Sequence, residues 1–277
     1  MKRRDVIDDH PCFSSKAHNT KGRLHLPVSP KCNIQCRFCT RANNTDENRP
    51  GVAAGILKPE EAVETVKRAL ELCPQISVVG IAGPGDTLAD DNAIRAFEEV
   101  HKAYPELIKC LSTNGLNLPG KADRLYEVGV RTITVTVNAI DPETLKGVVS
   151  WVKDGRDLIK AQLQGIRECA EKGMVVKVNT VLIPGVNDNS IAKIARVVKE
   201  AGATRHNIIP LIPQNEFAGV APPTCEQIEK ARMEAGKYIE EFRHCKHCRA
   251  DACGIPGISD VSKELYKGRE LETFSHG

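Results

Sequence analysis

Runs of apolar and β-branched residues recur along the middle of the chain, each followed by a polar loop and an amphipathic stretch. Several runs are apolar throughout instead of alternating, which is typical of strands in a parallel sheet that helices cover. We therefore predict strands at residues 24–29, 75–82, 108–112, 132–138, 174–183 and 206–212.

Between these runs, apolar residues recur at the spacing of a helix. The pattern predicts helices at 60–72, 158–171 and 191–201, and in the first of these one face carries Ala62, Val63, Val66, Ala69 and Leu70. A glycine suits the left-handed position that ends a helix. Such a glycine stands just before a predicted strand at Gly129, Gly173 and Gly202.

Strands that alternate with helices predict an α/β fold with a parallel sheet, either open or partly closed into a barrel. Its crossovers should be right-handed, and its active site should lie at the carboxyl ends of the strands. The candidate functional residues follow that rule. A cysteine triad follows the first strand, residues 83–86 the second, Asn114 the third and Asn179 the fifth.

Two segments fall outside the repeat. Residues 1–23 precede the first strand and carry His10, Cys12 and His18, and residues 244–277 carry Cys245, Cys248 and Cys253. Both are short for independent domains. We interpret them as arms that fold over the mouth of the barrel, which leaves 24–243 as the core domain.

Composition narrows the class of protein. The 277 residues include 39 Lys+Arg and 36 Asp+Glu, and so small an imbalance gives no case for nucleic acid or an anionic membrane as partner. The start lacks the apolar core of a signal peptide, and no apolar run is long enough to span a bilayer. We expect a cytoplasmic protein.

Its eleven cysteines are odd in number and tightly clustered, which favours metal or cluster ligation in a reducing, oxygen-poor cell over disulfides.

Cys32, Cys36 and Cys39 form a C-x3-C-x2-C motif after the first strand. Three thiolates bind three irons of a [4Fe–4S] cubane and leave the fourth iron open. That iron can chelate the amino and carboxylate groups of S-adenosylmethionine (SAM), whose C5′–S bond an electron from the cluster then breaks to give a 5′-deoxyadenosyl radical. A structural zinc site is the alternative, but zinc requires four ligands and the loop offers three. The triad therefore predicts a radical SAM enzyme.

Further candidates for cofactor binding follow the strands. The segment from Ala82 through Gly83, Gly85 and Asp86 resembles the glycine-rich element of radical SAM enzymes, whose backbone carbonyls bind the methionyl ammonium; the alternative is an ordinary turn. Asn114 and Asn179 stand where ribose or carboxylate contacts would fall, or are turn or cap residues. Phe38, the aromatic residue before the last triad cysteine, completes the set.

Cysteines outside the triad are less specific. Cys245 and Cys248 form a C-x2-C pair, which ligates metal or acts as a redox dithiol, while Arg249 and Asp251 beside them could form a plain surface pair. Two thiolates cannot close a cubane, so further ligands or labile binding are implied. By default we interpret the remaining cysteines, and a histidine in a strand, as structural: Cys73, Cys110, Cys169, Cys225 and His25.

The order of these motifs resembles the NifB family of nitrogenase cofactor maturases. The resemblance covers about residues 10–254 and is carried by His10-Pro11-Cys12, His25-Leu26-Pro27-Val28, the triad and the segments 47–52, 82–86, 112–116 and 245–252. It implies a partial (β/α)6 TIM-like barrel of the radical SAM type. The two motifs that flank the triad point beyond the superfamily to this family.

The resemblance also implies a reaction. Two [4Fe–4S] clusters, K1 and K2, are fused into an [8Fe–9S–C] core, NifB-co, with a SAM-derived carbide and an additional sulfur. The resemblance further implies that Cys12, His25 and Cys110 are the K1 ligands and that Cys245 and Cys248 are the K2 ligands. Glu47 and Arg49 would assist proton removal or cluster positioning. The partners implied are iron–sulfur cluster donors, an electron donor such as ferredoxin, and a downstream cofactor carrier or scaffold protein.

The chain departs from the family pattern at three places. Many bacterial members carry another cysteine in the stretch that corresponds to 40–47, and none is present here. Cys253 replaces a usually apolar residue and is either a spare ligand or without a role. The sequence stops at Gly277 without a C-terminal carrier-like domain, as in archaeal forms, so a separate carrier is expected.

Two other functions stay open at this point. A radical SAM enzyme with an auxiliary cluster could act on an organic substrate such as a nucleotide or peptide, but Cys12 and His25 would then lack roles. A non-enzymatic iron–sulfur carrier would explain the cysteines, but not residues 83–86 or the open-iron spacing.

Overall fold

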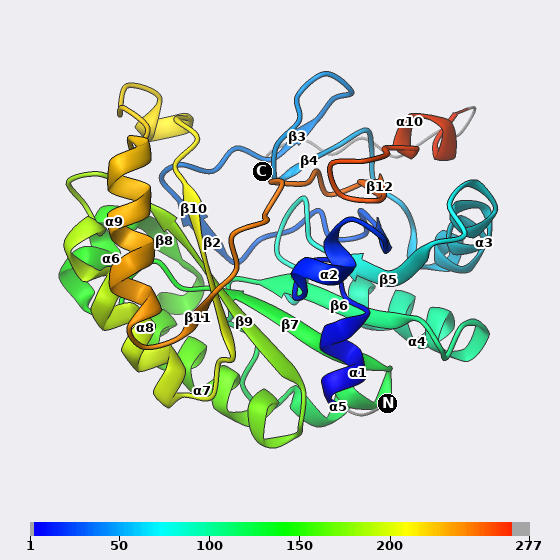
Figure 1. Cartoon of the computed structure of the whole chain (residues 1–277), viewed down its shortest axis with the longest axis horizontal. Coiled ribbons are helices and arrows are strands. Elements are labelled where there is room, and N and C mark those ends of the chain that lie inside the picture. The colour runs from blue at the N-terminus through cyan, green and yellow to red at the C-terminus, as the bar shows by residue number, and fades with distance from the viewer. Residues whose placement is uncertain (1–2, 268–277) are drawn as a thin grey trace.

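A curved sheet of mainly parallel strands forms the centre of the computed structural model, which describes residues 3–267 (Figure 1). Six parallel strands correspond to the six predicted ones: β1 (Gly22–His25), β5 (Ile76–Ile81), β6 (Ile108–Thr113), β7 (Val130–Thr136), β9 (Val175–Leu182) and β10 (Arg205–Pro210). The first strand begins and ends earlier than the expected 24–29. Pro27 lacks the N–H that a continued ladder would need.

Short strands extend the sheet at both edges. β11 (Glu240–Glu241) lies parallel to β10, and β12 (Cys253–Gly254) lies antiparallel to β1, with Cys253 opposite Leu24. The full order is β11-β10-β9-β7-β6-β5-β1-β12. The C-terminal arm therefore returns to the first strand of the core and pairs with its free edge.

Helices cover the outer face of the sheet (Figure 1). The predicted helices are confirmed as α3 (Ala62–Leu72), α7 (Leu158–Glu171) and α8 (Ile191–Glu200), although residues 60 and 61 belong to the short helix η1 (Pro59–Glu61). Gly129, Gly173 and Gly202 have positive φ angles of 85°, 90° and 108°, as their place between helix and strand predicts. The other outer helices are α4 (Asn92–Ala103), α5 (Ala122–Glu127), α6 (Pro142–Val148) and α9 (Cys225–Gly236).

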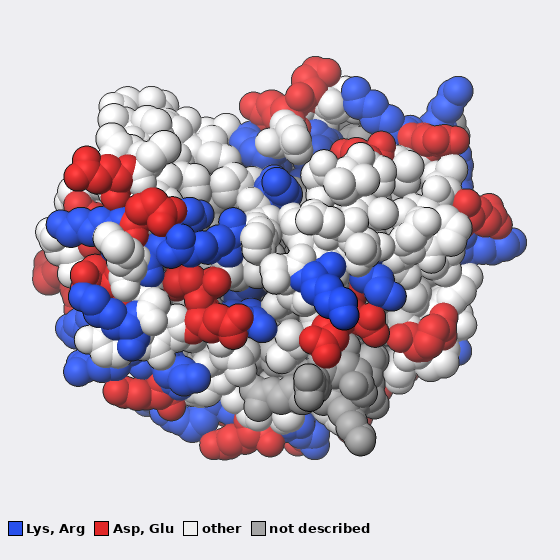
Figure 2. Space-filling view, viewed as in Figure 1, with Lys and Arg blue, Asp and Glu red and all other residues white. Residues whose placement is uncertain are grey.

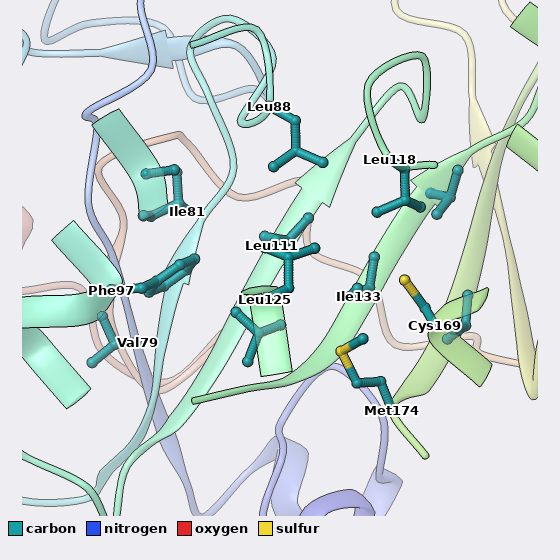
Figure 3. Close-up of a cluster of buried hydrophobic side chains, with 14 of the residues drawn as sticks. Val79, Ile81, Leu88, Phe97, Leu111, Leu118, Leu125, Ile133, Cys169 and Met174 are labelled. Atoms are coloured by element: carbon teal, nitrogen blue, oxygen red, sulfur yellow. The ribbon is translucent and has the colours of Figure 1, made fainter. Parts of the chain in front are cut away.

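The main core lies between the sheet and these helices. Figure 3 shows Val79, Leu111 and Ile133 on the strands, packed with Phe97 of α4 and Leu125 of α5. All five side chains are fully buried. Truncating a buried Phe to Ala in such a core costs about 3–5 kcal/mol, so this layer holds the sheet in its curved form.

The inner face of the sheet has a different chemistry. Side chains alternate between the two faces of a strand, so Gly80, Cys110 and Lys177 face inward next to outward-facing apolar neighbours. The N-terminal arm packs on this face. Its helices are α1 (Arg3–Asp8) and α2 (Ser15–His18).

The N-terminal arm is anchored at the amino ends of the strands. Val6 and Phe13 pack against Val78, Ile108 and Val175. The arm therefore lies inside the partial barrel, deeper than its mouth. We call the inner end of the cavity, which the arm and the inward-facing residues of the strands form, the floor. On the carboxyl side, two ribbons form the rim: β2 (Ile34–Cys36) with β8 (Val149–Val152), and β3 (Ala42–Asn43) with β4 (Val52–Ala53).

The charges on the surface are mixed. On the face shown in Figure 2, basic and acidic side chains alternate over the outer helices. On α9, for example, Arg232 pairs with Glu229 and Lys237 with Glu234 at helical spacing. Within the described residues, no helix is both long enough and apolar enough to cross a membrane.

Candidate functional site

A cavity of about 360 Å³ lies inside the partial barrel, between the floor and the rim. Strands, both arms and the loop after β1 contribute to its wall. All eight predicted cluster ligands line it: Cys12, His25, Cys32, Cys36, Cys39, Cys110, Cys245 and Cys248. Residues that are far apart in the sequence thus share one internal space.

The loop after β1 carries the triad, and we call this loop, residues 26–39, the radical loop. β2 within this loop pairs with β8, with Cys36 opposite Val149, and the Cys39 N–H donates to the Cys36 carbonyl at 3.0 Å. Phe38 lines the cavity and packs with the apolar cluster around Ile34. The ribbon therefore holds the loop in one conformation at the carboxyl edge of the sheet.

The thiols of the radical loop fit a cubane better than a single metal ion. All three are free and partly exposed toward the cavity. Within residues 3–267, no three His, Cys, Asp or Glu side chains converge as ligands of one ion would. A cubane takes each thiolate on a different iron, so its ligands need not converge.

Burial keeps these thiols neutral in the absence of metal. It raises the pKa of Cys32 to about 11 and raises the pKa values of Cys36 and Cys39 as well. A cysteine ligates iron as the thiolate, so binding of a cluster releases protons from these groups.

The loop after β5 contacts the radical loop through its backbone. The Gly85 N–H donates to the Ser29 carbonyl at 2.6 Å, and the Asp86 N–H donates to the Lys31 carbonyl at 2.7 Å. A Cβ on Gly85 would overlap the Lys31 backbone, so glycine is required there. Gly83 has a φ of 119°, which other residues rarely adopt.

Asp86 joins this loop to the one after β6. Its carboxylate accepts hydrogen bonds from the Asn114 and Leu88 N–H groups and from the Thr113 hydroxyl. Asn114 in turn donates through Nδ2 to Asn33 at 2.7 Å and lies 3.8 Å from the Cys32 Sγ. The carboxylate is thus fully engaged by the protein, while Asn114 reaches the radical loop.

Asn179 also lines the cavity, as its position after a strand predicts. Its side-chain oxygen accepts a hydrogen bond from Asn207 on the neighbouring strand at 3.0 Å. The amide is therefore oriented by β10, with its remaining groups toward the cavity.

One rung of the sheet carries two predicted K1 ligands, with one strand between them. His25 pairs with Gly80, and Gly80 pairs with Cys110. A Cβ on Gly80 would lie 3.0 Å from Cδ2 and 3.4 Å from Nε2 of His25. Glycine between them leaves space at this point of the floor for a group that both side chains could ligate.

The His25 ring is oriented for ligation. Its Nδ1 lies 2.9 Å from the Arg249 carbonyl oxygen, so Nδ1 carries the proton and Nε2 is left as an acceptor. Burial, followed by the charge of Arg23, lowers the pKa of His25 to about 4. The imidazole is therefore neutral at physiological pH, which is the form that binds metal.

Two buried cations line the floor, and the sequence pattern had not singled them out. Arg23 donates to the Cys248 Sγ at 3.3 Å, and Lys177 donates to the Cys12 carbonyl at 3.1 Å. Neither forms an ion pair with a carboxylate in the described part of the chain. Residues two apart on a strand point to the same face of the sheet. Arg23 lies two residues before His25, and Lys177 two residues before Asn179, so each shares a face with a predicted site residue.

Glu47 and Arg49 lie in the loop between β3 and β4. Arg49 lines the cavity, pairs with Glu47 at 2.7 Å and donates to the Thr40 carbonyl at 2.9 Å. The Glu47 side chain is largely exposed and is not part of the lining. A hydrogen bond from Asn44 lowers its pKa.

Arg249 and Asp251 form a buried pair that connects the C-terminal arm to this loop, instead of a plain surface pair. Their side chains are 9% and 2% exposed and lie 2.8 Å apart. Arg249 also donates to the carbonyls of Asn44 and Glu47, and Asp251 accepts from the Ala54 N–H at 2.5 Å. We call this set the arm–loop clamp.

The remaining cysteines lie away from the cavity lining. Cys73, Cys169 and Cys253 are buried in the main core, which gives Cys253 a packing role. Cys225 is exposed at the first residue of α9.

The comparison with protein families gives the class first. Residues 26–198 match the model of the radical SAM superfamily, and the triad, the barrel and the cavity agree with that class. The chain is therefore a radical SAM protein, a class that uses a [4Fe–4S] cluster and SAM.

Curated relatives give the family. The chain is 44% identical to FeMo cofactor biosynthesis protein NifB of Methanocaldococcus infernus, over 96% of this chain and 92% of that protein. It is 42% identical to the protein of the same name from Klebsiella pneumoniae, over 91% of this chain and 58% of that longer protein. The chain belongs to the NifB family, the radical SAM enzymes of FeMo cofactor biosynthesis.

Solved structures agree at the level of the fold. Streptococcus suis SuiB matches with a TM-score of 0.62 at 12% identity, over 82% of this chain and 50% of that one. Methylornithine synthase (PylB) matches with a TM-score of 0.53 at 15% identity, over 98% and 82%. The predicted partial barrel of the radical SAM type is confirmed.

Proposed function

We propose that this chain fuses two [4Fe–4S] clusters, K1 and K2, with a SAM-derived carbide and an additional sulfur into the [8Fe–9S–C] precursor NifB-co. One observation carries the proposal. A single cavity is lined by the radical loop at one side and by a second set of predicted cluster ligands at the floor. A radical SAM enzyme with an auxiliary cluster and an organic substrate would use Cys245 and Cys248, but it would leave Cys12 and His25 on the same cavity wall without roles.

The rim of the cavity supplies the radical chemistry. When bound to the three triad thiolates, a [4Fe–4S] cluster supplies the electron that cleaves SAM. The protein positions SAM with the backbone of residues 83–86, with Asn114 and Asn179, and with Phe38 at the cavity wall. Asp86 holds the two rim loops in register.

The floor holds the substrate clusters. Cys12, His25 and Cys110 bind K1, and Cys245 and Cys248 bind K2. Iron–sulfur clusters with thiolate ligands are anionic, and the buried cations Arg23 and Lys177 provide the opposite charge. In this reaction one SAM gives its methyl group to a K2 sulfide, and a second gives the radical that removes hydrogen from that methyl.

The methyl carbon must also lose protons to become a carbide. Arg49 lines the cavity and holds Glu47 through an ion pair, so we assign proton removal or cluster positioning to this pair. The proposed partners are iron–sulfur cluster donors, an electron donor such as ferredoxin, and a carrier or scaffold protein that receives the product.

Anaerobic reconstitution tests this function. The wild-type chain should take up about twelve irons, as three cubanes, and transfer label from [methyl-¹⁴C]SAM into an extractable iron–sulfur product. Cys110→Ala and Cys245→Ala should lose the labelled product but still form 5′-deoxyadenosine. Cys225→Ala, exposed on α9, is the matched control.

Two outcomes would contradict the proposal. Full iron loading without label in the product would exclude carbide insertion. Near-normal activity of Cys12→Ala and His25→Ala would favour an organic substrate instead.

A further inference from the structure

His18, another of the histidines on the cavity wall, has a ring nitrogen without a partner among the described residues. His18 ends α2 in the N-terminal arm, is 4% exposed and lines the same cavity as Cys245 and Cys248. Its Nδ1 lies 2.9 Å from the Pro11 carbonyl oxygen. A carbonyl only accepts hydrogen bonds, so Nδ1 carries the proton. Nε2 therefore holds a lone pair, and it has no hydrogen-bond partner among the described residues.

The arrangement at His18 repeats that at His25. In both, Nδ1 faces a backbone carbonyl oxygen at 2.9 Å and Nε2 is left for the cavity. A histidine that ligates metal almost always donates its other N–H to a carbonyl, a carboxylate or water. The protein thus holds both rings in the tautomer and orientation of a ligand.

His10 provides a contrast within the same wall. It is 1% exposed, but its Nδ1 accepts a hydrogen bond from the Cys12 N–H at 3.0 Å. Its proton must therefore lie on Nε2, which makes that atom a donor. Burial and a free Nε2 alone would not separate His10 from His18, whereas the tautomer does.

The ring of His18 lies next to the C-terminal arm. Its centroid is 5.5 Å from that of His244, the residue before Cys245, and 6.2 Å from that of Phe242. The C-x2-C motif offers two thiolates, while a cubane has four irons to satisfy. His18 is thus a buried, oriented donor on the wall where the site has too few ligands.

We propose that His18 Nε2 is the third protein ligand of the substrate cluster held by Cys245 and Cys248. This inference rests on the proposed function, because it requires that pair to bind a cluster. A neutral imidazole adds no negative charge and binds iron less tightly than thiolate does, which suits a cluster that must be consumed. Each substrate cluster would then have one imidazole ligand.

A variant that retains only this site gives the test. The triad and the K1 ligands are replaced by serine or alanine at positions 12, 25, 32, 36, 39 and 110, and the chain is reconstituted with iron and sulfide. Pulsed EPR of the reduced cluster should show one histidine nitrogen coupling, identified by ¹⁵N-histidine labelling. His18→Ala in this background should lose that coupling, and iron retention against a chelator should fall severalfold.

Further variants keep the result interpretable. His18→Cys should restore iron retention without the nitrogen coupling, which separates ligation from a folding defect. His101→Gln, on the outer helix α4, should leave the coupling unchanged. A coupling that persists in His18→Ala, or that disappears in His244→Ala instead, would overturn the assignment.

Failure of this inference is distinguishable from failure of the proposed function. A cluster that binds to Cys245 and Cys248 but shows no nitrogen coupling overturns the role of His18 alone. If the pair takes up no cluster even with His18 present, the His18 assignment is wrong, and so is the proposal that the floor binds two substrate clusters.

Discussion

At the scale of single residues, the site depends on positions where one additional Cβ atom, or the position of one proton on a histidine ring, decides whether a contact can form. Gly85 allows the loop after β5 to approach the radical loop, and Gly80 opens the floor beside His25. Tautomers are fixed in the same way, by backbone carbonyls opposite His18 and His25. Small local features, an absent Cβ or a backbone carbonyl, thus define where a ligand can bind.

Gly85→Ala should destabilise the apoprotein by about 3 kcal/mol, near the upper end for overpacking, because the added methyl overlaps the Lys31 backbone. The radical loop should then retain less iron. Gly219→Ala is the control, since a Cβ there meets open space. Urea unfolding and iron analysis measure the two effects, and equal stability of both variants would contradict the packing argument.

Cluster loading should strengthen as pH rises. Burial raises the pKa of Cys32 to about 11 and that of Cys12 to about 12, so both thiols are protonated in the metal-free chain at neutral pH. Each thiol that ligates iron releases a proton, which gives up to about a tenfold gain in affinity per pH unit and per thiol. Chelator competition at pH 7 and pH 9 measures this gain. Equal iron retention at the two pH values would show that the thiols are already ionised.

At the scale of elements, long regular segments carry the scaffold, and short ones shape the site. β1 and β6 carry the floor residues His25 and Cys110, whereas the ribbons β2–β8 and β3–β4 position the rim. The arm–loop clamp connects the rim to the C-terminal arm through Arg249 and Asp251. It places a buried ion pair where two irregular segments meet.

Breaking the clamp should be costly. Asp251→Leu should destabilise the chain by about 3–5 kcal/mol, because it leaves the Arg249 charge buried and unpaired. Arg249→Leu combined with Asp251→Leu should cost less than the sum of the single changes. The exposed pair of Lys146 and Glu143 on α6 is the control, with an expected coupling below about 1 kcal/mol. Double-mutant cycles by urea unfolding measure both, and similar couplings would refute a clamp.

The sequence pattern predicts the six long strands and three of the outer helices, gives no range for α4 or α9, and misses the two-residue strands. Strands such as β9 bury several consecutive residues and show a clear apolar run, whereas β11 and β12 have two residues each and no periodicity. The triad is predictable because its three ligands lie in one loop. Arg23 and Lys177 are not, because the meaning of a cation within a strand depends on which face of the sheet becomes the floor.

At the scale of the whole molecule, the cavity joins the two ends of the chain. Cys12 comes from the N-terminal arm, Cys110 from the middle of the sheet and Cys248 from the C-terminal arm. In the proposed function K1 connects the N-terminal arm to the sheet through Cys12 and Cys110, and K2 is bound by the C-terminal arm through Cys248. Anything that binds the folded state stabilises it in proportion to its affinity and concentration.

Loading of the floor should therefore protect both arms. Limited proteolysis under anaerobic conditions should cut residues 8–25 and 244–254 several times more slowly in the loaded chain than in the metal-free chain. Removal of iron by a chelator should restore the cutting. Cys110→Ser should lose most of the protection in the N-terminal arm, while Cys225→Ser should retain it. Equal cutting with and without iron would show that the arms are held by packing alone.

The path of the chain around the floor has a consequence for biosynthesis on the ribosome. β12 pairs with β1, and Cys248 accepts a hydrogen bond from Arg23. The C-terminal arm, which is synthesised late, therefore packs on the strand that is synthesised first. A nascent chain that has emerged only as far as α9 would possess the triad but lack Cys245, Cys248 and the arm–loop clamp. If the proposed function holds, the radical-generating half of the site can mature during translation, whereas the second substrate cluster can bind only after translation has passed residue 248.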